Sequence, residues 1–106
     1  MNSNLTRDVM KTYTLCGSMR FEKEMKEIAY FLETQKGYNI LQCIYVVGGN
    51  EPTSDELQKL ELAHYHKIDI SDGIYVLNIG GYTGESVRKE IEYAKLHGKE
   101  VIYHCN

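Results

Sequence analysis

The chain has 106 residues, of which 42% are hydrophobic and 25% charged, and its formal net charge is −3. A chain of this length supports one domain with a modest core. The 12 Lys and Arg residues are scattered among 15 acidic residues, so we expect no nucleic-acid partner, because backbone binding requires a basic surface. The sequence has no charged and apolar leader and no apolar run of about 20 residues, so we expect neither an export signal nor a membrane partner. Three cysteines without paired metal-ligand spacing, Cys16, Cys43 and Cys105, fit a protein of the reducing cytoplasm.

The first half of the chain predicts two strands and one helix. Residues 1–10 are polar and unpatterned, and we expect a flexible tail before a single domain of residues 11–106. Residues 11–16 predict a short strand. A helix is predicted from Phe21 to the glycine at position 37, because apolar residues recur at helical spacing and glycine often ends a helix. Residues 38–47 are rich in β-forming residue types, and the glycines and proline of residues 48–52 break that segment. The apolar positions of the helix are Phe21, Met25, Ile28, Ala29 and Leu32.

The second half predicts two more helices and two more strands. Thr53 followed by Glu56 forms a capping-box pattern, which predicts a helix from residue 54 to about residue 69. Residues 74–79 are almost continuously apolar, as is typical of a strand buried inside a parallel sheet. A glycine-rich loop, a helix over about residues 86–97 and a last strand at residues 101–103 complete the chain. The apolar face of the residue 54–69 helix consists of Leu57, Leu60, His64 and Ile68.

The order of these elements, β-α-β-α-β-α-β, indicates an α/β fold. We expect a Rossmann-like or flavodoxin-like three-layer α/β/α sandwich, with a four-stranded parallel sheet in the order 2-1-3-4 and right-handed crossovers. In such a sheet, ligands bind outside the carboxyl ends of the strands, where the direction of winding changes. The turn at residues 16–20 and the loop at residues 80–86 are expected to meet there.

Both of these segments have a functional and a structural interpretation. Gly17, Ser18 and Arg20 offer backbone N–H groups, a hydroxyl and a positive charge to an anion; a plain turn in which Ser18 caps the next helix explains them equally well. The later loop has three glycines in five residues. Such a loop costs chain entropy unless the backbone must approach a ligand closely, so it predicts ligand contact, with a purely structural loop as the alternative.

Glu90 is the acidic residue of the last predicted helix that the pattern places at the edge of the core. Val87, Ile91 and Ala94 define the buried stripe. At about 100° per residue, Glu90 lies about 40° from Ala94, whereas Glu92 points to the opposite side. A half-desolvated carboxylate near the strand ends suits nucleophilic or acid–base chemistry. The alternative is an ordinary first-turn glutamate that interacts favourably with the helix dipole.

At these residues the sequence resembles the nucleoside 2-deoxyribosyltransferase family and the related deoxynucleoside 5′-monophosphate N-glycosidases. The resemblance spans roughly residues 13–103, and three segments carry it by their order and spacing: Leu15–Arg20, Ser71–Val76 and Gly84–Ala94. Residues 80–85 also look like the glycine-rich phosphate loop of nucleotide-sugar-binding Rossmann-like proteins.

The resemblance implies cleavage or exchange of the N-glycosidic bond of 2′-deoxynucleosides or their 5′-monophosphates. Glu90 matches the family's nucleophile, which attacks the anomeric carbon of the deoxyribose. The resemblance implies no metal and no organic cofactor, and a homodimer or larger homo-oligomer in which a neighbouring subunit completes the site. The candidate substrate- or phosphate-binding residues are Cys16, Gly17, Ser18 and Arg20 in the first turn, and Gly81, Gly84 and Ser86 in the later loop.

The sequence departs from the family at two positions. One family aspartate falls at His64, and the aspartate that acts on the leaving base falls at Gly84. His64 is a candidate to donate a proton or a hydrogen bond to the base, or else a histidine on the inner face of its helix, and Asp69 and Glu85 are substitute acids. The missing aspartates favour an alternative function, a non-catalytic nucleotide-binding sensor that uses the same cleft.

Overall fold

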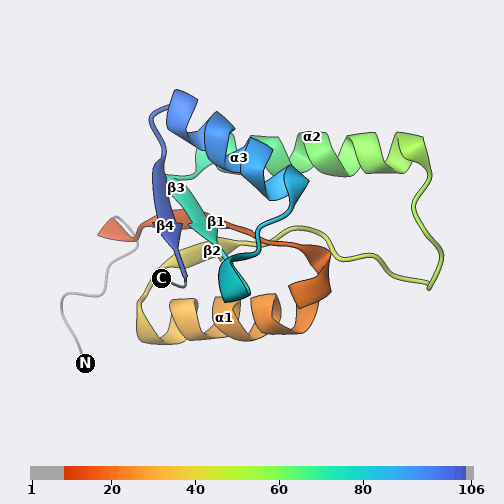
Figure 1. Ribbon diagram of the computed structural model, residues 1–106. Helices are drawn as coiled ribbons and strands as arrows, with labels where there is room; N and C mark the ends of the chain where they lie inside the picture. The colour runs from red at the N-terminus through yellow and green to blue at the C-terminus, as the bar shows by residue number, and fades with distance from the viewer. Residues whose placement is uncertain (1–8, 105–106) are drawn as a thin grey trace.

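The computed structural model describes residues 9–104 and has an α/β architecture with a single parallel sheet (Figure 1). The strands are β1 (Thr12–Cys16), β2 (Asn39–Leu41), β3 (Gly73–Val76) and β4 (Glu100–Tyr103). They pair in the order β2-β1-β3-β4, and every pairing is parallel. The predicted Rossmann-like or flavodoxin-like fold and its strand order are therefore confirmed. The predicted tail lies outside the described residues except for Val9 and Met10.

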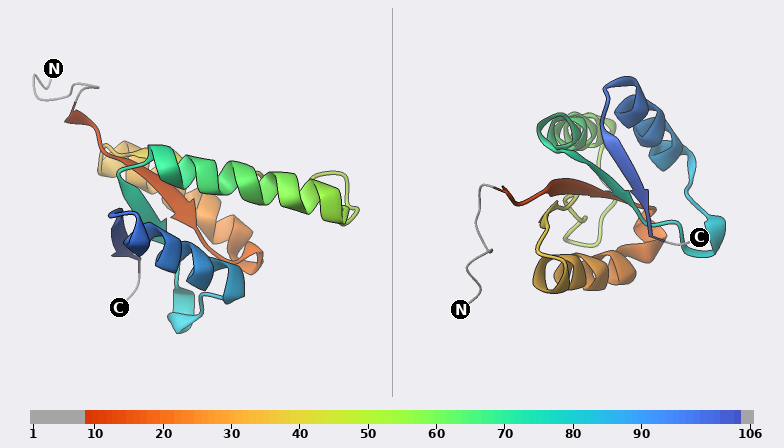
Figure 2. Two further views of the ribbon diagram at one scale, coloured as in Figure 1. Left: turned by 90° about the horizontal axis from the view of Figure 1, so that it is seen from above. Right: turned by 90° about the vertical axis from the view of Figure 1, so that its left-hand side faces the viewer.

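The helices form a layer on each face of the sheet (Figures 1 and 2). Helix α1 (Glu22–Gln35) covers one face, and helices α2 (Ser54–Ile70) and α3 (Glu85–Leu96) cover the other. Two short 3₁₀ helices, η2 (Met19–Phe21) and η3 (Ile79–Gly81), follow β1 and precede α3. The sheet grows in opposite directions from β1, so right-handed crossovers require α1 and the other two helices to lie on opposite faces.

The α1 layer confirms the predicted helical stripe. Met25, Ala29 and Leu32 are buried against Tyr13 and Leu15 of β1, and Phe21 and Ile28 pack around them. The opposite layer has its own core: Cys16 and the β3 residues Ile74 and Val76 pack against Ile68 of α2 and against Val87 and Ala94 of α3. Residues of β1 thus alternate between the two cores, as the period of a strand requires. This alternation turns Thr14 and Cys16 toward α2 and α3.

The region between β2 and α2 differs from the prediction. The β-rich segment 38–47 forms only three paired residues, and the chain then leaves β1. Beyond that point the Lys67 ammonium donates a hydrogen bond to the Gln42 carbonyl at 2.8 Å, while Ile44 and Val46 stay exposed. β2 lies at the edge of the sheet and pairs with β1 on one side. Once the chain leaves β1, residues 42–47 have no neighbouring strand to pair with among the described residues, and their β-propensity alone does not extend β2.

Helix α2 is as long as predicted, but its apolar face is buried at one end only. Ile68 is fully buried, whereas Leu57 is 53% exposed. The reason is geometric: the N-terminal half of α2 projects beyond the sheet, together with the preceding loop (Figure 2, left). The predicted strand at residues 74–79 is also shorter, because the chain turns into η3 after Leu77, whose N–H donates to the Cys16 carbonyl at 2.8 Å. Across residues 9–104, every helix is too short or too polar to cross a lipid bilayer.

Candidate functional site

A cavity of about 740 Å³ lies where the segments that follow β1, β2 and β3 meet. This is the crevice at the carboxyl ends of the strands that the fold predicts for a ligand. Its volume lies in the range of small-molecule sites. The described residues that line it come from the end of β1 (Leu15), the β1–α1 turn (Gly17, Ser18, Met19), the segment after β2 (Cys43, Ile44, Val46), helix α2 (among them Leu57, His64 and Lys67) and the η3–α3 region (Tyr82 to Val87 and Glu90).

Glu90 and His64 meet in this cavity. The two helices that carry them, α3 and α2, lie side by side on the same face of the sheet (Figures 1 and 2). His64 Nε2 is 3.2 Å from Glu90 Oε1, and the side chains are only 12% and 13% exposed. Because an ionised carboxylate only accepts hydrogen bonds, the tautomer with the proton on Nε2 donates a hydrogen bond to Glu90 Oε1. The contact fixes the orientation of the Glu90 carboxylate.

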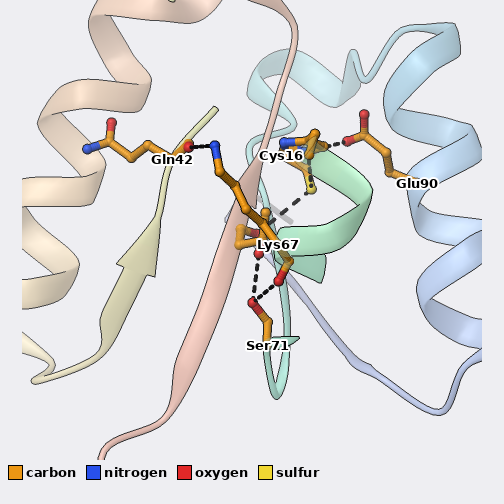
Figure 3. Close-up of polar contacts among 7 residues, drawn as sticks. Cys16, Gln42, Lys67, Ser71 and Glu90 are labelled. Atoms are coloured by element: carbon orange, nitrogen blue, oxygen red, sulfur yellow. Dashed lines mark hydrogen bonds and ion pairs between the residues drawn. The ribbon is translucent and has the colours of Figure 1, made fainter. Parts of the chain in front are cut away.

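Cys16, the last residue of β1, is buried behind the cavity wall and contacts His64. Figure 3 shows its side chain near Glu90. Its sulfur is 3.6 Å from His64 Nε2 and 3.8 Å from the Thr14 carbonyl oxygen. Burial raises the pKa of the Cys16 thiol well above its ordinary value, and the Glu90 charge raises it further. The thiol is therefore neutral near pH 7 and donates its weak hydrogen bond to the Thr14 carbonyl.

The Cys16–His64–Glu90 cluster brings one sulfur, one ring nitrogen and one carboxylate oxygen within 4.8 Å of one another. The second ring nitrogen of the histidine, Nδ1, is buried and has no hydrogen-bond partner among residues 9–104. Buried polar atoms usually have a partner. His64 thus contacts Glu90 and Cys16 through Nε2, while Nδ1 has no hydrogen-bond partner among the described residues.

The first predicted loop lines the cavity and also caps a short helix. Gly17 and Ser18 line the cavity, and Ser18 Oγ also caps η2 by accepting a hydrogen bond from the Arg20 N–H at 3.3 Å. A Cβ atom added at Gly17 would lie 2.9 Å from Met25 Sδ and 3.2 Å from Leu77 Cβ. Glycine is therefore needed here so that α1 can pack closely against the end of β3.

The backbone conformation explains the glycines of the second loop. Gly80, Gly81 and Gly84 have φ values of +64°, +82° and +81°, a region that other residues rarely occupy. The left-handed turns thus require these glycines even without a close ligand. Gly84 and Ser86 nevertheless line the cavity, and Gly84 provides no side-chain cap for α3.

Three of the predicted binding residues, Cys16, Arg20 and Gly81, do not line the cavity wall formed by the described residues. The Arg20 guanidinium instead lies over the Tyr82 ring, 4.0 Å from its centroid, and Tyr82 lines the cavity. Cys16 lies behind the wall, as described above. Of the two substitute acids, Glu85 lines the cavity and forms an ion pair with Arg88. Asp69 lies outside the wall and accepts a hydrogen bond from the Tyr93 hydroxyl.

The spacing of residues along the chain does not group Cys16 with the two candidate catalytic residues. Cys16 belongs to a predicted binding turn, and it has no metal-ligand spacing to His64 or Glu90 in the sequence. Three periodic patterns in the sequence, taken together, indicate that these residues lie close to one another. Cys16 alternates onto the α2–α3 side of the sheet, His64 lies on the apolar face of α2, and Glu90 lies at the edge of the α3 stripe.

The comparisons with known proteins add no family to this description. Searches of protein-family models, of curated proteins and of solved structures found no match to the chain. The fold and the geometry of the cavity are therefore what define the site.

Proposed function

We propose that the protein cleaves or exchanges the N-glycosidic bond of 2′-deoxynucleosides or their 5′-monophosphates, with Glu90 as the nucleophile. The observation that carries the proposal is the position of the Glu90 carboxylate. It is 13% exposed, is held by His64 and shares a cavity with Gly17 and Ser18. A carboxylate in such a partly desolvated site is a suitable covalent nucleophile for a sugar carbon.

The proposed reaction has two displacements. In the first, a Glu90 oxygen forms a bond to the anomeric carbon while the bond to the base breaks, and the base leaves with the electron pair and takes up a proton. In the second, water or another base attacks the same carbon and releases Glu90. His64 acts here as a positioning residue, because its Nε2 lies 3.2 Å from Glu90 Oε1.

The proton for the leaving base has two candidate sources. Glu85 lines the cavity and is largely exposed, so it can exchange protons with solvent. Water in the open cavity is the other source. Position 84, where the family has an aspartate, is a glycine and supplies no acid.

The test is to incubate the protein with each deoxynucleoside and each 5′-monophosphate, with and without a second base, and to measure released base by chromatography. Glu90→Gln should lower turnover by about 10³-fold or more, as loss of a nucleophile does in other enzymes. Glu92→Gln is the matched control, since Glu92 lies on the same helix and is exposed. Wild-type protein quenched during turnover should carry a 2-deoxyribosyl adduct on Glu90, detectable by peptide mass spectrometry.

A second candidate function is a nucleotide sensor without turnover. Two observations favour it: position 84 has no carboxylate, and both polar groups of the His64–Glu90 pair already bond to each other. Calorimetric binding of a deoxynucleotide with no released base would favour the sensor over the enzyme. Base release that persists in Glu90→Gln would contradict the proposed nucleophile.

A further inference from the structure

The Cys16–His64–Glu90 cluster has a property that the proposed reaction does not use. A nucleophilic glutamate needs a positioning partner, but it does not need a buried cysteine sulfur beside that partner. The three ligand-type atoms converge from three different elements, β1, α2 and α3, onto one point at the floor of the cavity. Thiolate, imidazole and carboxylate together are a ligand set typical of zinc.

We propose that Cys16, His64 and Glu90 form a binding site for a thiophilic divalent cation of the zinc class. The distances support it. Tetrahedral zinc, with bonds of about 2.0–2.3 Å, holds its ligand atoms about 3.4–3.6 Å apart. His64 Nε2 lies 3.6 Å from the Cys16 sulfur and 3.2 Å from Glu90 Oε1, and the third pair is within 4.8 Å. Small side-chain rotations therefore complete three corners of a tetrahedron.

The remaining corner faces the cavity. His64 and Glu90 line the cavity, whereas Cys16 lies behind them. A cation held by the three side chains thus has protein on one side and open space on the other. Three protein ligands with one open position are the arrangement of catalytic zinc sites, whereas structural sites are closed by four protein ligands.

The proton balance of binding is simple. The Cys16 thiol releases its proton to solvent when the sulfur–metal bond forms. His64 needs the lone pair of Nε2, so its proton resides on Nδ1, which has no hydrogen-bond partner among the described residues and so loses no bond. The hydrogen bond from Nε2 to Glu90 is replaced by the two metal–ligand bonds.

A bound cation also occupies the Glu90 oxygen. If the proposed function is correct, zinc therefore inhibits the glycosidic reaction, because the Glu90 lone pair that would attack the sugar is bound to the metal. The site itself does not depend on that function, so its test uses the metal alone.

The experiment titrates the reduced full-length chain with Co²⁺ in a phosphine reductant and then adds Zn²⁺. We expect a near-ultraviolet thiolate-to-cobalt band and visible bands of tetrahedral cobalt, both abolished by Zn²⁺. Cys16→Ser should remove the thiolate band. His64→Gln and Glu90→Gln should weaken binding by at least about tenfold, the loss already found when outer partners of metal ligands are removed. Mg²⁺, which prefers octahedral oxygen ligands, should not compete.

Matched control variants show whether the cobalt bands come from the Cys16–His64–Glu90 cluster. Cys43→Ser retains the band, since Cys43 lines the cavity but lies outside the cluster, and His66→Gln and Glu92→Gln leave the affinity unchanged. If Cys16→Ser does not fold, the two other ligand variants decide. A folded wild type without a thiolate band, or a band that survives Cys16→Ser or disappears in Cys43→Ser, overturns the site. Cobalt binding without base release contradicts the glycosidase alone, and base release without cobalt binding contradicts the metal site alone.

Discussion

The inner and outer walls of the cavity differ in how firmly the rest of the chain holds them. The inner wall, defined here as Leu15, His64, Val87 and Glu90, is buried or nearly so. The outer wall, defined as Ile44, Val46, Leu57 and Tyr82, is exposed by 41–61%. The inner wall rests on both the sheet and two helices, whereas the outer wall rests on the loop after β2, the projecting half of α2 and the glycine-rich loop.

The difference shows that an apolar stripe predicts burial only where the helix has a partner surface. The stripe of α2 runs from Leu57 to Ile68, yet only its C-terminal half packs on the sheet. His64 belongs to the packed half of α2, and Glu90 of α3 lies 3.2 Å from it. The apolar side chains of the outer wall have no such partner surface among the described residues and stay exposed.

The largest expected effect is a difference in the free energy of unfolding between substitutions in the two halves of α2. Ile68→Ala should lower the free energy of unfolding by about 2–5 kcal/mol, because it opens a cavity in a fully buried core. Leu57→Ala should change it by less than about 0.5 kcal/mol, as exposed substitutions usually do. Urea unfolding followed by circular dichroism measures both values.

The result for Leu57 also tests whether the outer wall stays uncovered in solution. A cost for Leu57→Ala that approaches the cost for Ile68→Ala would mean that another molecule buries this side chain. Sedimentation equilibrium would then show a wild-type oligomer that dissociates in Leu57→Ala. A monomeric wild type with a costly Leu57→Ala would contradict the exposed placement of the N-terminal half.

The next effect concerns the inner wall and rests on the proposed function. His64→Gln should lower kcat about 10- to 100-fold with little change in KM, since it removes the hydrogen bond that orients Glu90 but not a substrate contact. This corresponds to about 1.4–2.7 kcal/mol of transition-state stabilisation. His66→Gln is the matched control, because His66 is exposed two residues away on the same helix. A loss confined to KM would instead assign His64 to substrate binding.

The sequence predicted the fold well because hydrophobic periodicity is strong in most of the elements. The stripes at Met25, Ala29 and Leu32 and at Val87 and Ala94 are buried as expected, and the capping box formed by Thr53 and Glu56 begins α2. The β2 region was less predictable. Ile44 and Val46 have high β-propensity, but propensity does not provide the neighbouring strand that an extended β2 would need.

The candidate site was predicted in part for a different reason. Glu90 and Gly17 belong to segments whose place at the carboxyl ends of the strands follows from the topology. The neighbourhood of Cys16 was missed because it depends on the crossing of α2 and α3 over β1, which no single segment encodes. Arg20 was expected at the cavity because of its charge, but its guanidinium packs on Tyr82, a contact between side chains 62 residues apart in the chain that local patterns do not reveal.

A smaller effect follows from the buried thiol. Burial raises the pKa of Cys16 in the folded chain, so the unfolded chain ionises first. The contribution of the neutral thiol to stability is full below about pH 8.5, the ordinary thiol pKa, and is lost as the pH rises further. The free energy of unfolding should fall by up to about 1.4 kcal/mol per pH unit above that value. Urea titrations at several pH values should give a shallower decline for Cys16→Ala, and an unchanged slope would show that the folded chain also ionises Cys16.

The smallest effect lies in the outer wall, where Arg20 covers the Tyr82 ring. A cation–π contact at an exposed site contributes about 0.5–1 kcal/mol. A double-mutant cycle with Arg20→Met and Tyr82→Leu should return a coupling of that size in urea unfolding. Lys26, whose ammonium lies 4.8 Å from the centroid of the Tyr45 ring, provides a second cation–ring pair, and Arg20→Met should show no coupling to Tyr45→Leu.

A coupling near zero between Arg20 and Tyr82 would mean that the guanidinium is free to turn toward the cavity. Arg20 would then be available for the 5′-phosphate contact that the family resemblance implies, and the outer wall would contribute charge to recognition as well as apolar surface.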